Sequence, residues 1–191
     1  MREGMDPGLV SRAQQGDRQA FESLTVANHT RLFKVAYGIL RDRHLAEDAT
    51  QQAFFDIWRG LDRLRDTAKF EGWSYRLLVR ACYAEAKRRP DWVPDGELQS
   101  KDEPSAGDVL GSVADRDLLE RGFRHLSMDH RTAIVLRYLL DMTPEHIADT
   151  LDIPRKTVYT RLRRAVLAMR AAVEADTRAG NTTPVPRETV R

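Results

Sequence analysis

The sequence lacks the features that mark most enzymes and membrane proteins. Its 191 residues include one cysteine, Cys82, so no intrachain disulfide can form, and the apolar helical pattern around Cys82 predicts a buried structural thiol. The five histidines have no HExxH or Cys/His ligand spacing, and no GxGxxG, Walker or GxSxG motif is present. We therefore expect a protein that is not an enzyme, with no metal site and no cofactor.

Long apolar runs are missing too. No stretch approaches the roughly 18 apolar residues that indicate a membrane span, and residues 1–16 contain no apolar run of signal-peptide type. The sequence therefore predicts a cytoplasmic protein without membrane insertion.

Proline is absent from residues 8–89, where glycine is also sparse, and this favours helix. Apolar residues recur there at helical spacing, most clearly over 32–40 and 46–58. An earlier short helix is predicted at about 8–27. Residues 1–89 are thus expected to form an N-terminal domain of about four helices.

The composition changes sharply after residue 89. The segment 90–114 holds three prolines, three glycines and six acidic residues against one lysine, which is typical of an extended linker. A second helical domain is predicted at 115–176, and residues 177–191 are predicted to be a disordered tail. The expected fold is all-α, with two small helical domains joined by a flexible acidic linker.

The sharpest local pattern spans residues 142–169. Thr143 suits a helix N-cap and Pro144 suits the first helical position. The short helix that follows ends at a tight turn near Asp152, and Pro154 opens a longer helix. Two helices joined by such a turn form a helix-turn-helix, whose second helix normally enters the DNA major groove.

The second helix of this motif is basic on the side opposite its apolar stripe. Residues 153–170 contain six basic residues and no acidic one. An ordinary helical hairpin with a solvated basic face is the alternative, but the cap, the turn length and the one-sided charge favour DNA binding. The predicted contacts to an upstream DNA element are Arg155, Lys156, Thr157, Tyr159, Thr160, Arg163 and Arg164.

Three blocks of the sequence together resemble bacterial RNA polymerase sigma factors of the extracytoplasmic-function type. AEDATQQAFFDIW at 46–58 is similar to the core-polymerase-binding helix of that family. The residues at 69–89 are similar to its promoter-opening segment, and those at 126–165 to its minus-thirty-five-binding domain. The resemblance implies a transcription initiation factor whose partners are core RNA polymerase, promoter DNA and an anti-sigma factor.

Some positions depart from the family pattern. Arg80 and Ala84, both in the promoter-opening helix, stand where Asn and Asp are common. Gln52 stands where a Glu is common, and Asp152 where a Gly is common.

The resemblance also implies roles for residues of the first domain. One face of the 46–58 helix would dock on the largest polymerase subunit, although a plain solvated face is the alternative. Its residues are Asp48, Gln51, Gln52, Phe55, Asp56 and Trp58. The segment 61–89 would hold unpaired bases of the downstream element, with aromatic platforms and cations along the phosphates. Its predicted contacts are Lys69, Phe70, Trp73, Arg76, Arg80, Tyr83, Lys87 and Arg88.

Within that segment, the loop 67–72 resembles the minus-ten recognition loop, which would hold one flipped base. Tyr75 lies on the apolar stripe and is predicted to be a core residue, whereas Trp73 fits a core role and a platform role equally well. The acidic segment 90–114 would thread the polymerase channels and mimic nucleic acid.

Two other functions fit parts of the sequence. A dimeric helix-turn-helix repressor or activator would bind DNA without polymerase, but no long heptad seam for a dimer is visible and 30–89 would have no role. A helical adaptor, itself resembling an anti-sigma regulator, would show no dependence on DNA. The net charge of +2 says little about partners, because it sums +4 over 72–89, −5 over 90–114 and +6 over 153–170 with smaller terms elsewhere. This pattern indicates two separate DNA contacts with a segment between them that does not bind DNA.

Overall fold

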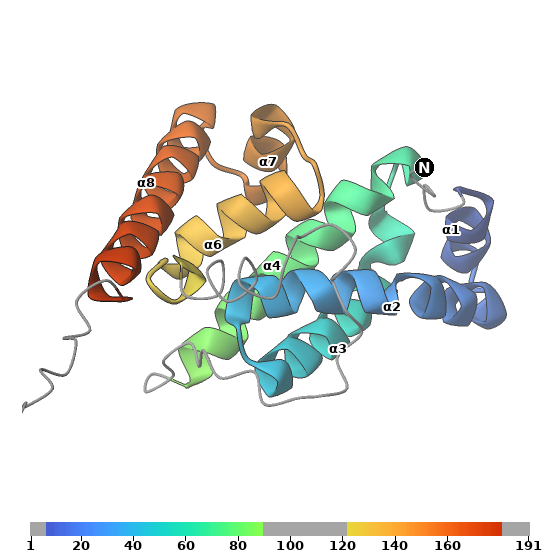
Figure 1. The fold of residues 1–191 in the computed structure, drawn as a ribbon. Coiled ribbons are helices and arrows are strands. Elements are labelled where there is room, and N and C mark those ends of the chain that lie inside the picture. Colours follow the sequence, from blue (N-terminus) through green and yellow to red (C-terminus); the bar gives the residue numbers. More distant parts are fainter. Residues whose placement is uncertain (1–6, 90–121, 181–191) are drawn as a thin grey trace, which may run out of the picture.

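The computed structural model describes residues 7–89 and 122–180, and every regular element in those two ranges is helical. The predicted linker at 90–114 and the residues from 181 onward lie outside the described residues. The all-α expectation is confirmed for the part that is described (Figure 1).

The N-terminal block is a bundle of α-helices with two short 3₁₀ turns between its last two members. Its elements in chain order are α1 (Pro7–Gln14), α2 (Arg18–Leu40), α3 (Arg43–Gly60), η1 (Leu61–Arg63), η2 (Thr67–Lys69) and α4 (Phe70–Arg88). Aspartates cap two of the helices: Asp17 accepts a hydrogen bond from the Ala20 amide at 3.0 Å, and Asp42 accepts one from the Leu45 amide at 2.9 Å. The predicted apolar faces of α2, α3 and α4 meet in one core.

The single helix predicted at about 8–27 is wrong in one respect. The chain breaks at Gly16, whose φ of +89° lies in the region that glycine adopts most readily, and α2 then starts after the Asp17 cap. The result is a short α1 that folds back on a long α2. Gly16 followed by Asp17 is the local signal for this break.

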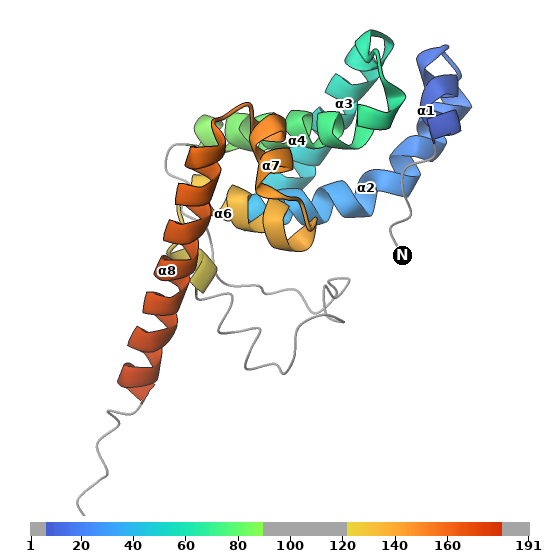
Figure 2. The same cartoon turned by 90° about the horizontal axis from the view of Figure 1, so that it is seen from above.

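The C-terminal block holds the predicted helix-turn-helix. Its elements are α6 (Met128–Ile134), the π-helical turn η3 (Val135–Leu139), α7 (Pro144–Leu151) and α8 (Arg155–Gly180). Two small apolar clusters hold them together, one around Leu136, Ile147 and Val158 and another around Leu126 and Ala165. The helix α8 continues to Gly180, past the predicted end of the second domain at Asp176, and its far end projects away from the other helices (Figure 2).

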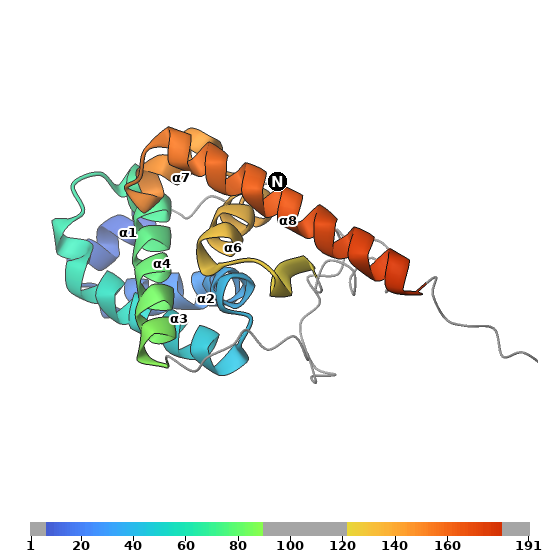
Figure 3. The ribbon, with the colours of Figure 1, turned by 90° about the vertical axis from the view of Figure 1, so that its left-hand side faces the viewer.

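The two blocks pack directly on each other. In Figures 1 and 3, α6 lies against α2, and α7 lies against α4. Val135 of η3 belongs to the main core, and a Cβ atom placed on Gly38 of α2 would come within 2.9 Å of the Val135 side chain. The glycine therefore permits this close approach of α2 to η3.

A buried arginine lies at the same boundary. Arg131 of α6 is 1% exposed, and its guanidinium donates to the Ile39 carbonyl at 2.7 Å and to the Leu126 carbonyl at 3.1 Å. Burial lowers the pKa of Arg131 to about 10. Its two acceptors come from different blocks, so Arg131 joins the end of α2 to the segment that leads into α6.

Candidate DNA and polymerase interfaces

The helix-turn-helix is built from local signals that the sequence carries. The Thr143 hydroxyl accepts from the His146 amide at 3.3 Å, and Pro144 opens α7 as predicted. Asp152 ends α7 in the left-handed conformation, with φ 56° and ψ 48°, and its N–H donates to the Ala148 carbonyl. The motif predicted over 142–169 is confirmed.

The basic face of α8 is open to solvent in its first three turns. Val158 and Ala165 are fully buried on the inner side, so the helix has a fixed rotation. Thr157 is half-buried, and the other predicted contacts to the upstream element are exposed: Arg155, Lys156, Tyr159, Thr160, Arg163 and Arg164. Tyr159 donates to Glu145 of α7 at 3.3 Å, so its ring is oriented by the preceding helix.

A cavity of about 500 Å³ lies beside this face, between the start of α6 and the first turns of α8. Lys156, Arg161 and Arg164 line it together with Asp129 and other residues. Lys156 and Arg164 at this hollow suit a phosphate oxygen better than an apolar ligand, whereas Arg161 is paired with the Asp129 carboxylate.

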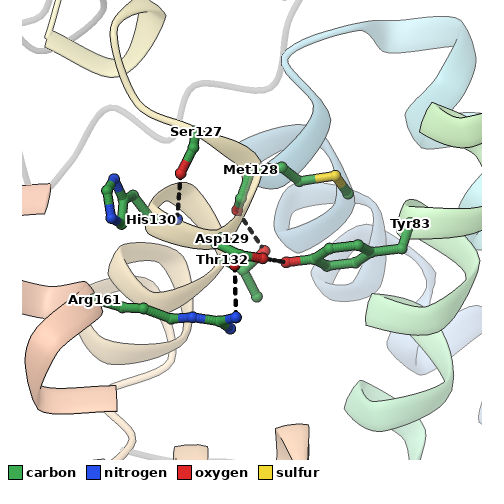
Figure 4. A network of polar contacts seen from close by, with 7 residues as sticks. All are labelled: Tyr83, Ser127, Met128, Asp129, His130, Thr132 and Arg161. Atoms are coloured by element: carbon green, nitrogen blue, oxygen red, sulfur yellow. Dashed lines mark hydrogen bonds and ion pairs between the residues drawn. The ribbon is translucent and has the colours of Figure 1, made fainter. Parts of the chain in front are cut away.

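Arg161 is a residue of α8 that the sequence-based contact set omits. Its guanidinium pairs with the Asp129 carboxylate at 2.6 Å, and the other oxygen of that carboxylate accepts from the Tyr83 hydroxyl of α4 (Figure 4). Asp129 therefore connects helices from both blocks, and hydrogen bonds from the His130 amide to Ser127 at 3.4 Å and from Thr132 to the Met128 carbonyl at 2.8 Å hold the start of α6 around it. Burial, and then the bond to Asp129, raise the pKa of Tyr83 to about 12.

The predicted downstream contacts fall into two groups. Lys69, Arg80, Lys87 and Arg88 are exposed, and Arg88 pairs with Glu85 at 2.6 Å. Phe70 is 3% exposed and packs against Trp73 with ring centroids 5.9 Å apart, so it offers no free ring face to a base in this conformation. Phe70 is thus a core residue in this conformation, and the base contact expected there stays a prediction.

Two more of these residues are occupied by the C-terminal block. Arg76 donates from its Nε to the Thr150 carbonyl at 3.0 Å and also binds the Asp149 carbonyl, both in the last turn of α7. Tyr83 is 36% exposed and bonded to Asp129. While these bonds are in place, the Arg76 guanidinium and the Tyr83 hydroxyl are engaged by the C-terminal block.

The face of α3 predicted to bind polymerase is largely solvent-exposed. Phe55 is 53% exposed with Arg59 over its ring, whereas Gln52 is half-buried and donates to Asp56 at 3.0 Å. Trp58 is 42% exposed, but one side of its ring packs on Phe21 of α2 with centroids 4.6 Å apart. Asp48 and Gln51 complete an exposed polar face with an aromatic rim.

Two sequence predictions about the interior are confirmed. Cys82 is buried, and burial raises the pKa of its thiol well above its ordinary value. Tyr75 is fully buried, the Arg31 guanidinium lies 5.4 Å from its ring centroid, and its hydroxyl has no hydrogen-bond partner.

Within the described ranges, no helix is long and apolar enough to cross a membrane.

Comparisons with known proteins agree with this architecture. The family model described as Sigma-70 region 2 matches residues 24–90, and the model described as Sigma-70, region 4 matches 116–169. The first covers α2 to α4 and the second covers the helix-turn-helix.

Curated relatives match over most of their length. The chain is 32% identical to an ECF RNA polymerase sigma-E factor of Haemophilus influenzae, over 84% of this chain and 90% of that protein. It is 26% identical to the ECF RNA polymerase sigma factor SigW of Bacillus subtilis, over 84% of this chain and 92% of that protein.

Solved structures share the fold. CnrH in complex with the cytosolic domain of CnrY matches with a TM-score of 0.65 and 21% identity, over 91% of this chain and 99% of that one. The sigma factor RpoE in complex with the anti-sigma factor NepR, from Bartonella quintana, matches with a TM-score of 0.64 and 21% identity, over 82% of this chain and 98% of that one. The chain therefore belongs to the extracytoplasmic-function class of sigma-70 factors, non-catalytic transcription initiation factors that bind core RNA polymerase and direct it to promoters.

Proposed function

We propose that this sigma factor divides promoter recognition between its two helical blocks. The helix α8 reads the upstream element as duplex DNA, the exposed face of α3 holds the polymerase, and the segment from η1 to the end of α4 captures the downstream element. The observation that carries the proposal is the exposed cationic face of α8, which stands on a fixed helix-turn-helix and has no acidic residue over 153–170.

The upstream contact is electrostatic and directional. Arginine can bind guanine through two hydrogen bonds, and the lysine and hydroxyl groups beside it can hold phosphates. Arg163 and Arg164 lie one turn or more beyond the start of α8 and are both exposed, so they can reach into a groove entered by that helix. Arg155 and Lys156, at its first turn, suit phosphates at the rim of the groove.

The downstream contact uses a different set of exposed groups. Lys69 at the end of η2 and Arg80 and Lys87 of α4 are exposed and can follow the phosphates of a single strand. Trp73 is half-buried, so part of its side chain is accessible from solvent. Arg76 and Tyr83 join this set once their bonds to α7 and Asp129 are broken.

An anti-sigma factor and a cytoplasmic location complete the proposal. Two solved structures that share this fold are complexes, one with the cytosolic domain of CnrY and one with the anti-sigma factor NepR. A regulator of this kind would cover the exposed faces of α3 and α8, because those faces serve the polymerase and the DNA.

The upstream role is tested by replacing exposed arginines on one helix. In a mobility-shift assay with core polymerase, we expect Arg163→Ala and Arg164→Ala each to weaken promoter binding by ~1–3 kcal/mol where a base contact is lost. Arg170→Ala is the matched control, since Arg170 is exposed on α8 beyond the motif and should bind like the unaltered protein.

The same assay separates the alternatives. A dimeric regulator would give a tight, specific shift without polymerase, and a protein adaptor would be insensitive to both arginine substitutions. Either result would contradict the proposed function.

A further inference from the structure

The short N-terminal helix α1 contacts the segment that joins α3 to α4. The amide nitrogen of Gln14, the last residue of α1, donates to the Leu61 carbonyl at 3.0 Å and to the Leu64 carbonyl at 2.6 Å. A side-chain amide has two N–H donors, and Gln14 uses both on this one turn. Other parts of α1 lie against η1 and η2, so the contact extends along the segment.

The Leu64 carbonyl is the one that depends on Gln14, because the Leu61 carbonyl also accepts from a backbone amide. The last carbonyls of a helix have no partner inside it, and α3 ends at Gly60 where η1 begins. The Leu64 amide closes a tight turn by donating to the Leu61 carbonyl at 3.2 Å, which leaves the Leu64 carbonyl to Gln14. Leu61 is buried and Leu64 is half-buried, so water is a poor substitute for the Gln14 amide here.

The helix that carries Gln14 is itself fixed. Val10 and Ala13 are buried in the main core. Across the turn between α1 and α2, Arg12 pairs with Asp17 at 2.7 Å, and Asp17 also caps α2. A side chain on this helix can therefore hold the segment at a defined place relative to the bundle.

Other contacts hold the two ends of the segment. Asp66 accepts from the Ala68 amide at 3.0 Å and so shapes η2. The Trp73 ring covers Gly60, where a Cβ atom would lie 3.2 Å from the ring. Between these supports Asp62, Arg63, Arg65, Asp66, Ala68 and Lys69 are all exposed. The side chains of the segment are thus exposed, whereas its backbone is held by the contacts of Gln14, Asp66 and Trp73.

We propose that Gln14 is a positioning residue for promoter opening. In this role α1 holds the backbone next to the loop that binds the downstream element. A loop that is already in its bound conformation does not lose conformational entropy when a base docks on it. By fixing the two carbonyls of the Leu61–Leu64 turn, Gln14 pre-organises the loop at 67–72 that follows. The inference rests on the proposed function, since it assigns to Gln14 an effect on the proposed downstream-element loop.

The test compares two glutamines that are neighbours in sequence. Gln14→Met keeps the length and approximate volume of the side chain and removes both donors, whereas Gln15→Met makes the same change at an exposed position. Each variant is assembled with core RNA polymerase on a promoter that the unaltered protein transcribes. Two quantities are measured: the affinity for core polymerase, and the rate constant of promoter opening from the permanganate reactivity of unpaired thymines.

We expect Gln14→Met to slow promoter opening by about tenfold, which corresponds to about 1.4 kcal/mol. Gln15→Met should open promoters at the normal rate, and both variants should bind polymerase normally. Gln14→Glu, which has the same shape but only acceptors facing two carbonyls, should open promoters at least as slowly as Gln14→Met. Thermal melting of each variant establishes that the bundle is folded.

Three results would overturn the inference. Normal promoter opening by both Gln14 variants would show that the hydrogen bonds from Gln14 to the Leu61 and Leu64 carbonyls are not needed. Equal losses of polymerase binding and promoter opening would show that Gln14 supports the whole bundle rather than the downstream site. If the unaltered protein opened no promoter with polymerase, the proposed function would fail first and the role of Gln14 with it.

Discussion

At the residue scale, single side chains determine where this chain turns. Asp17 and Thr143 start helices through their side-chain oxygens, and Gly16 takes a positive φ that separates α1 from α2. Asp152, like Arg41 and Asp141, takes a left-handed conformation that glycine adopts at lower energy. The family pattern commonly has glycine at this turn of the helix-turn-helix.

Replacing Asp152 tests this strain directly. We expect Asp152→Gly to raise the free energy of unfolding by about 0.5–1 kcal/mol, because glycine removes the Cβ penalty of the left-handed conformation. Asp152→Ala keeps the Cβ atom and should not stabilise the protein. Urea denaturation of the three proteins measures the effect, and equal stabilities for the glycine and alanine variants would contradict this explanation.

At the element scale, a few polar side chains join helices that the sequence places far apart. Tyr83 of α4 and Arg161 of α8 meet on the Asp129 carboxylate of α6, and Arg76 of α4 binds the last carbonyls of α7. The contact buries the Tyr83 hydroxyl beside a carboxylate, and both effects oppose its ionisation.

The Tyr83 contact predicts a pH dependence of stability. Its folded-state pKa of about 12 lies above the ordinary value of 10.0, so its contribution is fully present below pH 10 and is lost as the pH rises toward 12. The free energy of unfolding should therefore fall less steeply for Tyr83→Phe than for the unaltered protein between about pH 10 and 12. The lowered pKa of Arg131 acts in the opposite direction in both proteins, and the charge of Tyr83 raises that pKa only in the unaltered one. Parallel curves would mean that Tyr83 is not coupled to folding.

Local features of the fold were predictable, and the long-range contacts were not. The helix-turn-helix follows from Thr143, Pro144 and Pro154, because caps and prolines act within a few residues. The hydrogen bond from Gln14 to Leu61 joins residues 47 positions apart, and the one from Arg131 to Ile39 joins residues 92 positions apart. The periodicity of a sequence does not show which helices pack against each other.

The candidate site residues also divide into those whose exposure the local sequence pattern predicts and those whose contacts depend on the packing of distant helices. Exposure of the basic face of α8 follows from its opposite apolar stripe, so those residues were identified from the sequence. The burial of Phe70 was not predicted, because an aromatic residue at the start of a helix suits a base platform and a core equally well in one dimension. Arg161 was omitted, since its carboxylate partner lies on another helix.

At the scale of the whole molecule, the two blocks form one packed body in this conformation. The buried Arg131 and the close approach of Gly38 to Val135 hold α2 against the C-terminal block. The same packing occupies Arg76 and Tyr83, while the recognition face of α8 stays exposed. The proposed upstream and downstream sites are thus unequally available, and use of the full downstream site requires α7 and Asp129 to move away from α4.

The charge distribution agrees with two separate DNA sites, one in each helical block. The net charge is +4 over 72–89 and +6 over 153–170, with −5 over 90–114. Much of the long-range attraction to DNA therefore cancels in the free chain, and polymerase is expected to be needed for tight, specific binding.

Run-off transcription with purified core polymerase and genomic promoter fragments tests the central claim most directly. We predict defined transcripts that appear only when polymerase and this protein are both present, and that diminish with Arg163→Ala and Arg164→Ala but not with Arg170→Ala. Specific DNA binding by the chain alone, with no polymerase-dependent transcript from any fragment, would contradict the account.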